Sequence, residues 1–192
     1  MKLYFISRSE YKNIETPTFL TQMRQKFGEH ILIPEGGYSK KGAEGAALIY
    51  KYCEGKKFTH VCVAVGTATT FAGIVKASEE DTKVIGISAL KNMTDFEKRM
   101  KFLVGDIPKN YSFINDYHFG GYAKKNDELI SFINKFYIDY KIPLDFVYTG
   151  KMMFGIVDLI KQDYFPEGAK ILCIHTGGLQ GNKSLLDGTL NF

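Results

Sequence analysis

The chain has 192 residues, of which 45% are hydrophobic and 24% are charged, and its formal net charge is +4. This is the composition of a globular domain with a core, and so small a charge, spread along the sequence, argues against a nucleic-acid partner. No apolar run approaches the roughly 20 residues that cross a bilayer, and the apolar start is too short for a secretory signal. We therefore expect neither a nucleic-acid nor a membrane partner.

The cysteines and histidines give no sign of a disulfide framework or a metal site. Cys53, Cys62 and Cys173 are far apart in the sequence and lie in apolar surroundings, which is typical of buried, reduced thiols. The four histidines lack the spacing of metal ligands. We expect a cytoplasmic protein that binds no metal.

Hydrophobic periodicity and turn residues predict the elements in chain order. Up to residue 53 the predicted elements are a strand over Leu3–Ile6, a helix over Pro17–Phe27, a strand over Ile31–Ile33, a turn over Pro34–Gly37 and a helix over Lys41–Cys53. The small residues Gly42, Gly45 and Ala46 should let the last of these helices approach a sheet closely.

The remaining two thirds of the chain alternate between strands and helices. The predicted elements are strands over Val61–Val65, Lys83–Ile87 and Ile171–Ile174, helices over Phe71–Ser78, Thr94–Leu103 and Asp127–Tyr140, and a helix after Gly150 with Met153, Ile156, Val157 and Ile160 inward. This alternation predicts an α/β fold with a mainly parallel sheet flanked by helices.

Three loops follow predicted strand ends, where ligands bind in parallel α/β sheets. Residues 66–70, Gly-Thr-Ala-Thr-Thr, combine a tight turn, small residues and hydroxyl groups at a helix start, which would suit a phosphate. An ordinary turn with a threonine cap explains the same residues equally well. Residues 147–151 and 175–178 each look more like ordinary glycine turns when taken alone.

Taken together and in order, these motifs resemble one known family. The matching pieces are Ile33–Gly37 (IPEGG), Val63–Gly73 (VAVGTATTFAG), Gly121–Tyr122, Leu144–Lys151 (LDFVYTGK) and His175–Gly178 (HTGG). Their order and content resemble the 1-aminocyclopropane-1-carboxylate (ACC) deaminase/D-cysteine desulfhydrase family of pyridoxal-phosphate enzymes, which share the tryptophan synthase β-subunit fold. An unrelated flavodoxin-like domain would require all of these matches to be coincidence.

The resemblance implies a domain organisation and an assembly. Residues 31–192 would be the C-terminal half of the large cofactor domain, with its mainly parallel twisted sheet, and residues 1–30 the end of the small-domain element or a connector. The family's N-terminal half would be missing. A homodimer, or association with that missing half, is expected, and exposed apolar surface should cause self-association.

The resemblance also implies roles for particular residues. The cofactor phosphate would lie on the loop formed by Gly66, Thr67, Ala68, Thr69 and Thr70. Tyr148 would stand over the reacting carbon, with Tyr122 as the second active-site tyrosine. Thr149 would face the pyridine nitrogen, and Thr176 and Gly177 would line the ring side of the pocket.

Thr149 bears on the substrate, a small amino acid. A threonine gives the pyridine nitrogen a neutral hydrogen bond, and so a weaker electron sink than a carboxylate would. Ring opening of ACC is demanding, whereas β-elimination from D-cysteine expels a good leaving group. We therefore favour the desulfhydrase-like branch.

Two departures from the family pattern matter. Ala68 stands where many relatives have glycine, which is tolerable if its φ is negative. The Schiff-base lysine of the family, in its N-terminal half, has no counterpart here, and Lys151 is not a substitute because it belongs to a helix start. We expect this chain alone to be inactive. The alternative is a non-catalytic domain that binds phosphate or pyridoxal phosphate, or that assembles with a partner.

Overall fold

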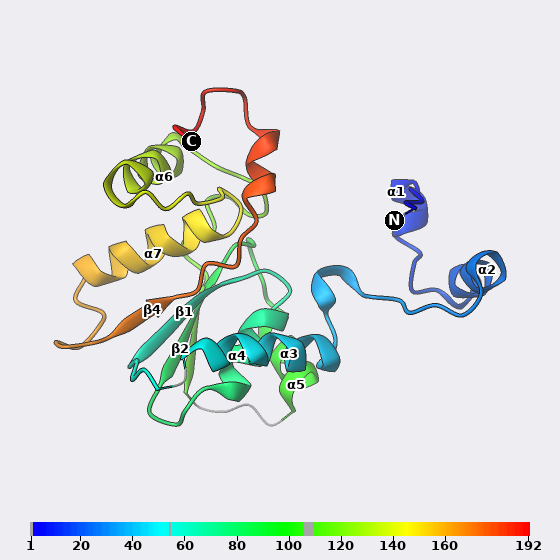
Figure 1. Cartoon of the computed structure of the whole chain (residues 1–192), viewed down its shortest axis with the longest axis horizontal. Coiled ribbons are helices and arrows are strands. Elements are labelled where there is room, and N and C mark those ends of the chain that lie inside the picture. Colours follow the sequence, from blue (N-terminus) through cyan, green and yellow to red (C-terminus); the bar gives the residue numbers. More distant parts are fainter. Residues whose placement is uncertain (1, 54, 106–109) are drawn as a thin grey trace. The chain divides into compact units, whose positions relative to one another are not determined.

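A computed structural model describes residues 2–53, 55–105 and 110–192. The chain divides into two compact units, Met1–Ile33 and Pro34–Phe192 (Figure 1). The boundary lies three residues after the predicted one. Which domain of a whole enzyme each unit represents stays a prediction.

The first unit contains two helices and no strand among its described residues. Helix α1 spans Arg8–Tyr11, and helix α2 spans Pro17–Phe27, as predicted, with Thr16 as its N-cap. The predicted strands over residues 3–6 and 31–33 are wrong, because neither segment has a neighbouring strand to pair with. None of residues 2–33 is buried, so these residues form no core of their own.

The second unit is built on a four-stranded parallel sheet, which confirms the predicted fold class. The strands are β1 (His60–Val65), β2 (Lys83–Ser88), β3 (Tyr111–Ile114) and β4 (Ile171–Cys173), in the order β3-β2-β1-β4. Strand β3 was not predicted. Because all pairs are parallel, the carboxyl ends of all four strands lie at one edge of the sheet.

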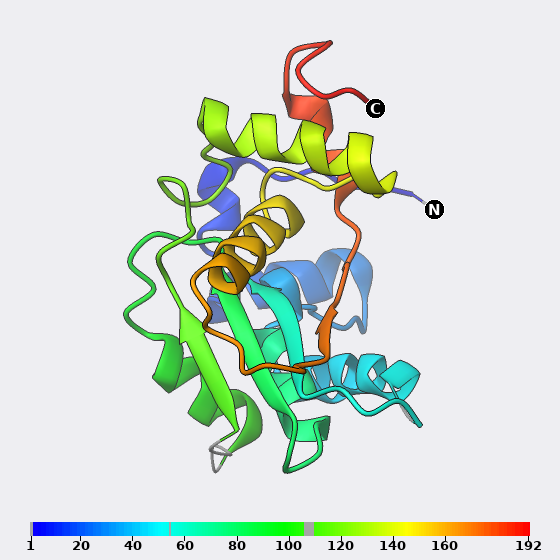
Figure 2. The same cartoon turned by 90° about the vertical axis from the view of Figure 1, so that its left-hand side faces the viewer.

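Helices cover both faces of this sheet (Figures 1 and 2). The helices on one face are α3 (Lys40–Ala47), α4 (Thr69–Ala77) and α5 (Phe96–Val104). On the other face lies α7 (Thr149–Lys161), with α6 (Asp127–Tyr140) outside it. Separate apolar cores fill the two sides of the sheet, which is typical of a sheet that is buried on both faces.

Three details of the helix predictions are corrected. The predicted helix over residues 41–53 is α-helical only to Ala47 and continues as a 3₁₀ helix, η2 (Leu48–Cys53). Gly42 lies against the Gly37 carbonyl and the Thr69 side chain of α4 rather than against the sheet, and Gly45 has no atom within 4 Å of where a Cβ would lie. In α7 the inward positions include Ile156 as predicted, but Ile160 is 49% exposed because Met152 and Leu159 share the buried face.

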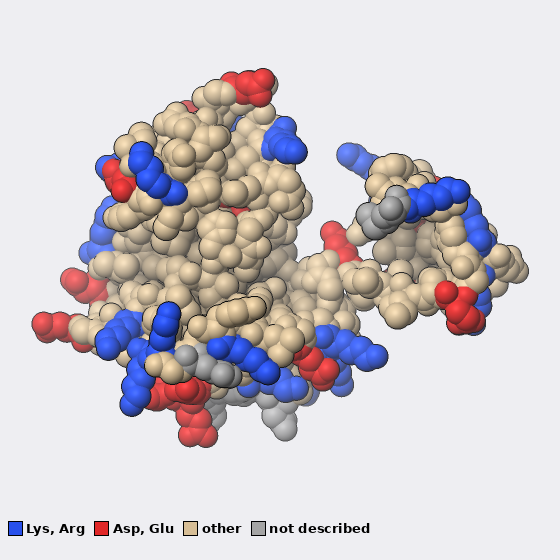
Figure 3. All heavy atoms as spheres, in the orientation of Figure 1, with Lys and Arg blue, Asp and Glu red and all other residues tan. Residues whose placement is uncertain are grey.

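The surface charges, the helices and the cysteines can be compared with what the composition predicts. In the view of Figure 3, lysine, arginine and acidic side chains of both signs lie mainly along the edges and lower part of the second unit, and its middle is mostly uncharged. Within the described ranges, no helix has both the length and the apolar character needed to cross a membrane. Cys62 and Cys173, far apart in the sequence, are paired positions on β1 and β4, and all three cysteines are free thiols.

Candidate active site

A cavity of about 180 Å³ opens at the carboxyl edge of the sheet. It lies where β1 ends, at the place where parallel α/β sheets bind ligands. Four separate parts of the chain meet there, and they contribute Gly36, Ala64, Gly66, Thr67, Thr70, Tyr148 and Thr176. Five of these residues were predicted as site residues from the sequence. Gly36 and Ala64 were not.

The loop between β1 and α4 presents an open helix start. Ala68 is the N-cap of α4, and no side chain caps that end of the helix. The Thr67 hydroxyl lies 2.9 Å from the Thr69 hydroxyl and donates to the Gly36 carbonyl at 3.3 Å. Gly36 belongs to the 3₁₀ turn η1 (Glu35–Gly37). This bond therefore joins the Ile33–Gly37 motif to the loop after β1, 31 residues further along the sequence.

These residues fit the phosphate group of the expected cofactor. Uncapped amide groups in the first turn of a nine-residue helix carry a partial positive charge that attracts an anion. Thr67 and Thr70 both line the cavity and can donate hydrogen bonds to phosphate oxygens. Thr69, at 5% exposure, and Ala68, at 2%, are buried and contribute through their backbone.

The backbone at Ala68 differs from the expectation of a negative φ. Its φ is +71°, in the left-handed region, where a side chain costs about 1–2 kcal/mol relative to glycine. The alanine is held there because the loop must turn sharply from β1 into α4. A glycine in this position would adopt the same φ without that cost.

We expect Ala68→Gly to leave the free energy of unfolding within about 1 kcal/mol of the parent, because relief of backbone strain offsets the lost methyl group and the added chain entropy. Ala72→Gly, in the regular part of the same helix, should lower it by about 2 kcal/mol. Urea denaturation followed by circular dichroism compares the two. Equal losses in both variants would show that Ala68 is not strained.

The segment before α7 is organised by the carboxylate of Asp145. Its Oδ1 accepts hydrogen bonds from the amides of Val147 at 2.9 Å and Tyr148 at 2.7 Å. Its Oδ2 accepts from the Thr149 amide at 2.9 Å and from the Thr149 hydroxyl at 2.6 Å. Asp145 is completely buried. It therefore caps α7 and fixes the backbone that carries Tyr148.

Thr149, expected to face the pyridine nitrogen, is completely buried. Its hydroxyl donates to Asp145 and accepts from the Asp145 amide at 2.9 Å. The hydroxyl proton is therefore used in the hydrogen bond to the Asp145 carboxylate. To donate to the pyridine nitrogen, the hydroxyl would have to break that bond. The expected role of Thr149 stays a prediction.

Tyr148 lies over Gly66, the glycine that begins the loop between β1 and α4. A Cβ at Gly66 would lie only 3.0 Å from the Tyr148 ring, so the absence of a side chain there makes room for the tyrosine. The ring of Tyr122, itself 60% exposed, meets that of Tyr148 edge-on at 6.0 Å. Burial, with the neighbouring Tyr122 and more distant carboxylates, raises the pKa of Tyr148 to about 12, so its hydroxyl keeps its proton at neutral pH.

The His-Thr-Gly-Gly segment follows β4 and packs beside Asp145. The His175 Nε2 lies 2.8 Å from the Pro143 carbonyl, and its Nδ1 accepts from the Gly177 amide at 3.0 Å. A side chain at Gly178 would begin 3.5 Å from Asp145 Oδ2. These contacts place Thr176 on the cavity, whereas Gly177 is adjacent to it and does not line it.

No lysine lines the cavity among the described residues. Lys151, 1% exposed, instead has its Nζ 2.6 Å from the Gly121 carbonyl and 2.9 Å from that of His118. Burial lowers the pKa of Lys151 to about 8, and the nearby Asp145 opposes this change. The ammonium group is therefore still charged at pH 7.

Sequence reasoning missed the roles of Asp145 and Lys151. An aspartate just before a helix start is a signal for capping, and it was available in the sequence. Nothing in the sequence indicates that Lys151 reaches backbone carbonyls in a loop 30 residues away, because only the packing of α7 against that loop creates the contact.

Comparison with known proteins finds a matching family model and similar solved structures. The family model described as pyridoxal-phosphate dependent enzyme matches residues 11–177. The crystal structure of an ACC deaminase homologue is 28% identical, with a TM-score of 0.74, over 94% of this chain and 59% of that one. A structure of a mutant O-ureido-L-serine synthase with O-ureido-L-serine bound is 12% identical, with a TM-score of 0.50, over 88% and 56%, and shares the fold alone. The chain thus spans less than two thirds of either protein's length.

Proposed function

This chain belongs to the family of pyridoxal-phosphate-dependent enzymes, and we propose that it forms the cofactor-holding part of a lyase or deaminase acting on a small amino acid. When bound, the cofactor supplies an electron sink for charge that develops on the substrate's α carbon. The functional form would be a homodimer or would include a further segment of chain.

The observation that carries this proposal is the convergence on one cavity. The uncapped start of α4, the hydroxyls of Thr67 and Thr70, the Tyr148 phenol and Thr176 all meet there. An anion-binding helix end beside a protonated phenol suits a cofactor that has a phosphate at one end and a reacting centre at the other.

We favour a desulfhydrase-like reaction within this class. Thr149, the group expected at the pyridine nitrogen, is neutral and donates its hydroxyl proton to Asp145, and the resulting weak electron sink would suit a substrate with a good leaving group such as the thiol of D-cysteine. Tyr148, with a pKa raised to about 12, would act as a proton donor and not as a phenolate base. ACC is the competing substrate, and product assays with both compounds on the complete enzyme separate them.

We further propose that this chain alone does not catalyse turnover. Covalent catalysis with this cofactor needs a lysine amine at the reacting end. No lysine lines the described cavity, and the Lys151 amine is occupied by backbone carbonyls. The lysine would then come from a segment outside this chain.

Equilibrium dialysis with pyridoxal phosphate tests the proposal. We expect the chain to bind one equivalent without the absorbance band at about 420 nm that marks attachment to a lysine. Thr67→Val and Thr70→Val, which keep shape but remove a hydroxyl, should each weaken binding about tenfold. Thr94→Val, at an exposed threonine outside the cavity, is the matched control and should leave the affinity unchanged.

Three outcomes would count against parts of this proposal. Covalent attachment of one equivalent to a single lysine of this chain, mapped by mass spectrometry after borohydride reduction, would remove the claim of inactivity. Equal weakening by the Thr94 control would show that binding is nonspecific. Absence of binding by the parent chain would leave a fold without its cofactor, and the catalytic assignment would have to be dropped.

A further inference from the structure

Lys151 is a buried cation that the proposed chemistry does not use. It lies in the first turn of α7, three residues after Tyr148. Its Nζ donates to the carbonyls of Gly121 at 2.6 Å, His118 at 2.9 Å and Ala89 at 3.5 Å. An ammonium group has three N–H donors, so these three carbonyls account for all of them.

The three carbonyls belong to two loops at the carboxyl edge of the sheet. Ala89 directly follows β2, and its amide is bonded to the Val65 carbonyl at the end of β1 at 2.9 Å. His118 and Gly121 lie at either end of a tight turn in the loop between β3 and α6, closed by a bond from the Gly121 amide to the His118 carbonyl at 3.0 Å. Lys151 thus connects α7 to both loops.

The turn at residues 118–121 and the residues just after it include backbone in the left-handed region. Phe119 has a φ of +51°, Gly120 of +92°, Gly121 of +114° and Ala123 of +53°. Two of these are non-glycine residues in the left-handed region, where a side chain is disfavoured. A backbone of this kind persists only when its surroundings hold it. Charge-assisted bonds from a buried ammonium are about twice as strong as neutral ones and can supply that constraint.

Tyr122 directly follows this turn. Its ring meets that of Tyr148 at a centroid distance of 6.0 Å and an interplanar angle of 65°. Tyr148 is the N-cap residue of α7. The start of this helix therefore carries Tyr148 directly, and the Lys151 side chain connects it to the turn that precedes Tyr122.

We propose that Lys151 is a positioning residue. Its buried ammonium donates hydrogen bonds to the carbonyls at both ends of the 118–121 turn, and these bonds hold Tyr122 against Tyr148 beside the cavity. This rests on the proposed function only in assigning the two tyrosines to the active site. The same contacts hold the amine away from the cavity, which accounts for a buried lysine that takes no part in covalent catalysis.

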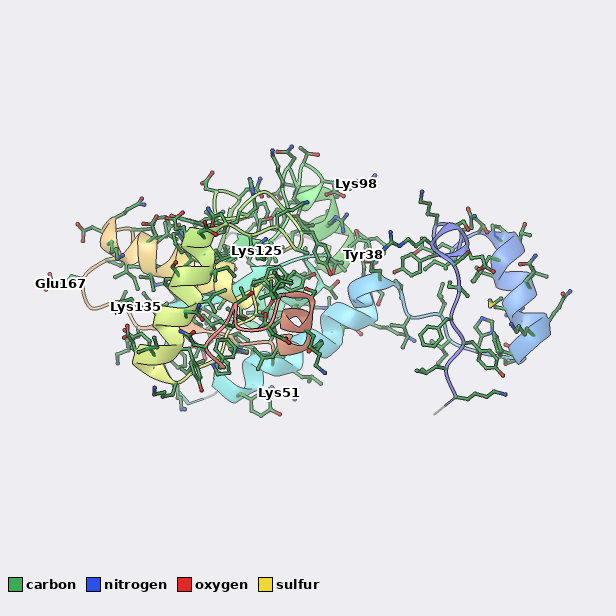
Figure 4. The ribbon with its side chains drawn as sticks, turned by 90° about the horizontal axis from the view of Figure 1, so that it is seen from above. Tyr38, Lys51, Lys98, Lys125, Lys135 and Glu167 are labelled. Carbon is green, nitrogen blue, oxygen red and sulfur yellow. The ribbon has the colours of Figure 1, made fainter. Side chains whose placement is uncertain are left out.

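The test compares the parent chain with Lys151→Met, which keeps the length of the side chain but has no donors, and with Lys151→Ala in the presence of ethylammonium chloride. Tetramethylammonium chloride, a cation without N–H groups, is the control for the added salt. Lys125→Met is the matched control variant, because Lys125 is exposed and comes from the same loop (Figure 4). Amide hydrogen exchange and the ¹³Cζ signal of Tyr148, assigned with Tyr148→Phe, are the two readouts.

In Lys151→Met we expect amide exchange over residues 115–126 to accelerate about tenfold or more, with residues 60–77 unchanged, and the Tyr148 signal to move. Lys151→Ala should show the same two changes. Ethylammonium should reverse them in that variant, whereas tetramethylammonium should not. Lys125→Met should match the parent. Unchanged loop exchange and an unchanged Tyr148 signal in folded Lys151→Met would overturn the proposal. So would equal acceleration over residues 60–77 without rescue, which marks general support of the core.

The parent chain alone provides a further check if neither variant folds. A Lys151 ammonium held by three carbonyls should give a ¹H–¹⁵N signal protected from solvent exchange at neutral pH, and absence of that signal would contradict the proposal. Pyridoxal phosphate affinity keeps the two hypotheses apart. If the parent chain binds no cofactor but Lys151→Met shows the exchange and ¹³C changes, the positioning role stands and the proposed function is lost. If the parent chain binds cofactor but Lys151→Met shows neither change, the proposed function stands and the positioning role is lost.

Discussion

Replacement of Asp145 by alanine is expected to lower the free energy of unfolding by about 3 to 5 kcal/mol. The carboxylate accepts three backbone amides and one hydroxyl, all in a completely buried site. Without it, these donors lose their partners in a region that water cannot reach. The nearby Lys151 cation also loses an acidic group that favours its charged form.

Urea denaturation followed by far-ultraviolet circular dichroism measures this effect, because the chain has no tryptophan to report on it. Asp139→Ala is the matched control. Asp139 forms an exposed i,i+4 ion pair with Lys135 on α6, and its removal should change stability by less than about 1 kcal/mol. Similar losses in the two variants would show that Asp145 does not cap α7 in solution.

The effect of Asp145 extends to the proposed function. The backbone that it holds carries Tyr148 and Thr149, one on the cavity and one expected at the pyridine ring. Asp145→Asn keeps the shape but places an N–H group where an acceptor is needed. We therefore expect it to lie between the parent and the alanine variant in stability.

Replacement of Gly73 by alanine is the second large effect, expected to lower the free energy of unfolding by about 2 to 3 kcal/mol. A Cβ at Gly73 would collide with the Ala43 carbonyl oxygen and lie 2.7 Å from the Ala47 amide nitrogen. Both are backbone atoms of α3 and cannot rotate away, so the two helices would have to separate. Because α4 begins at the loop proposed to hold the cofactor phosphate, cofactor affinity should fall as well.

Gly45→Ala is the control for Gly73→Ala. Gly45 lies in α3 and has no atom within 4 Å of where a Cβ would lie. Alanine is favoured over glycine in a helix by about 1 kcal/mol, so this variant should be more stable than the parent. Thermal unfolding of both variants decides the question, and a destabilised Gly45→Ala together with a neutral Gly73→Ala would contradict the packing described here.

Several elements of both units could be predicted from local patterns. The apolar run that forms β1, the proline at the start of α2, and the apolar stripe of α6 each predicted an element correctly. These segments form because their periodicity and caps agree with their burial. Residues 3–6 and 31–33 have strand-like composition as well, but a strand exists only when a neighbour supplies hydrogen bonds.

Contiguous motifs could be located from the sequence, whereas contacts between distant residues could not. The loop from Gly66 to Thr70 and the segment around Tyr148 could be identified because each is continuous in the sequence, and both reach the cavity. The positive φ of Ala68 could not be foreseen, since the turn from β1 into α4 imposes it. Whether Thr149 would be free or bonded likewise depended on Asp145, which encloses it.

The sequence by itself therefore determined the fold class, the order of most elements and the motifs that meet at the sheet edge, because these depend on periodicity, turn chemistry and residue order. Tertiary structure alone decided which loops share the cavity, which face of α7 is buried and where the Lys151 ammonium lies. These outcomes depend on hydrogen bonds and packing between residues distant in the chain, and such contacts arise only once parallel strands bring their carboxyl ends to one edge.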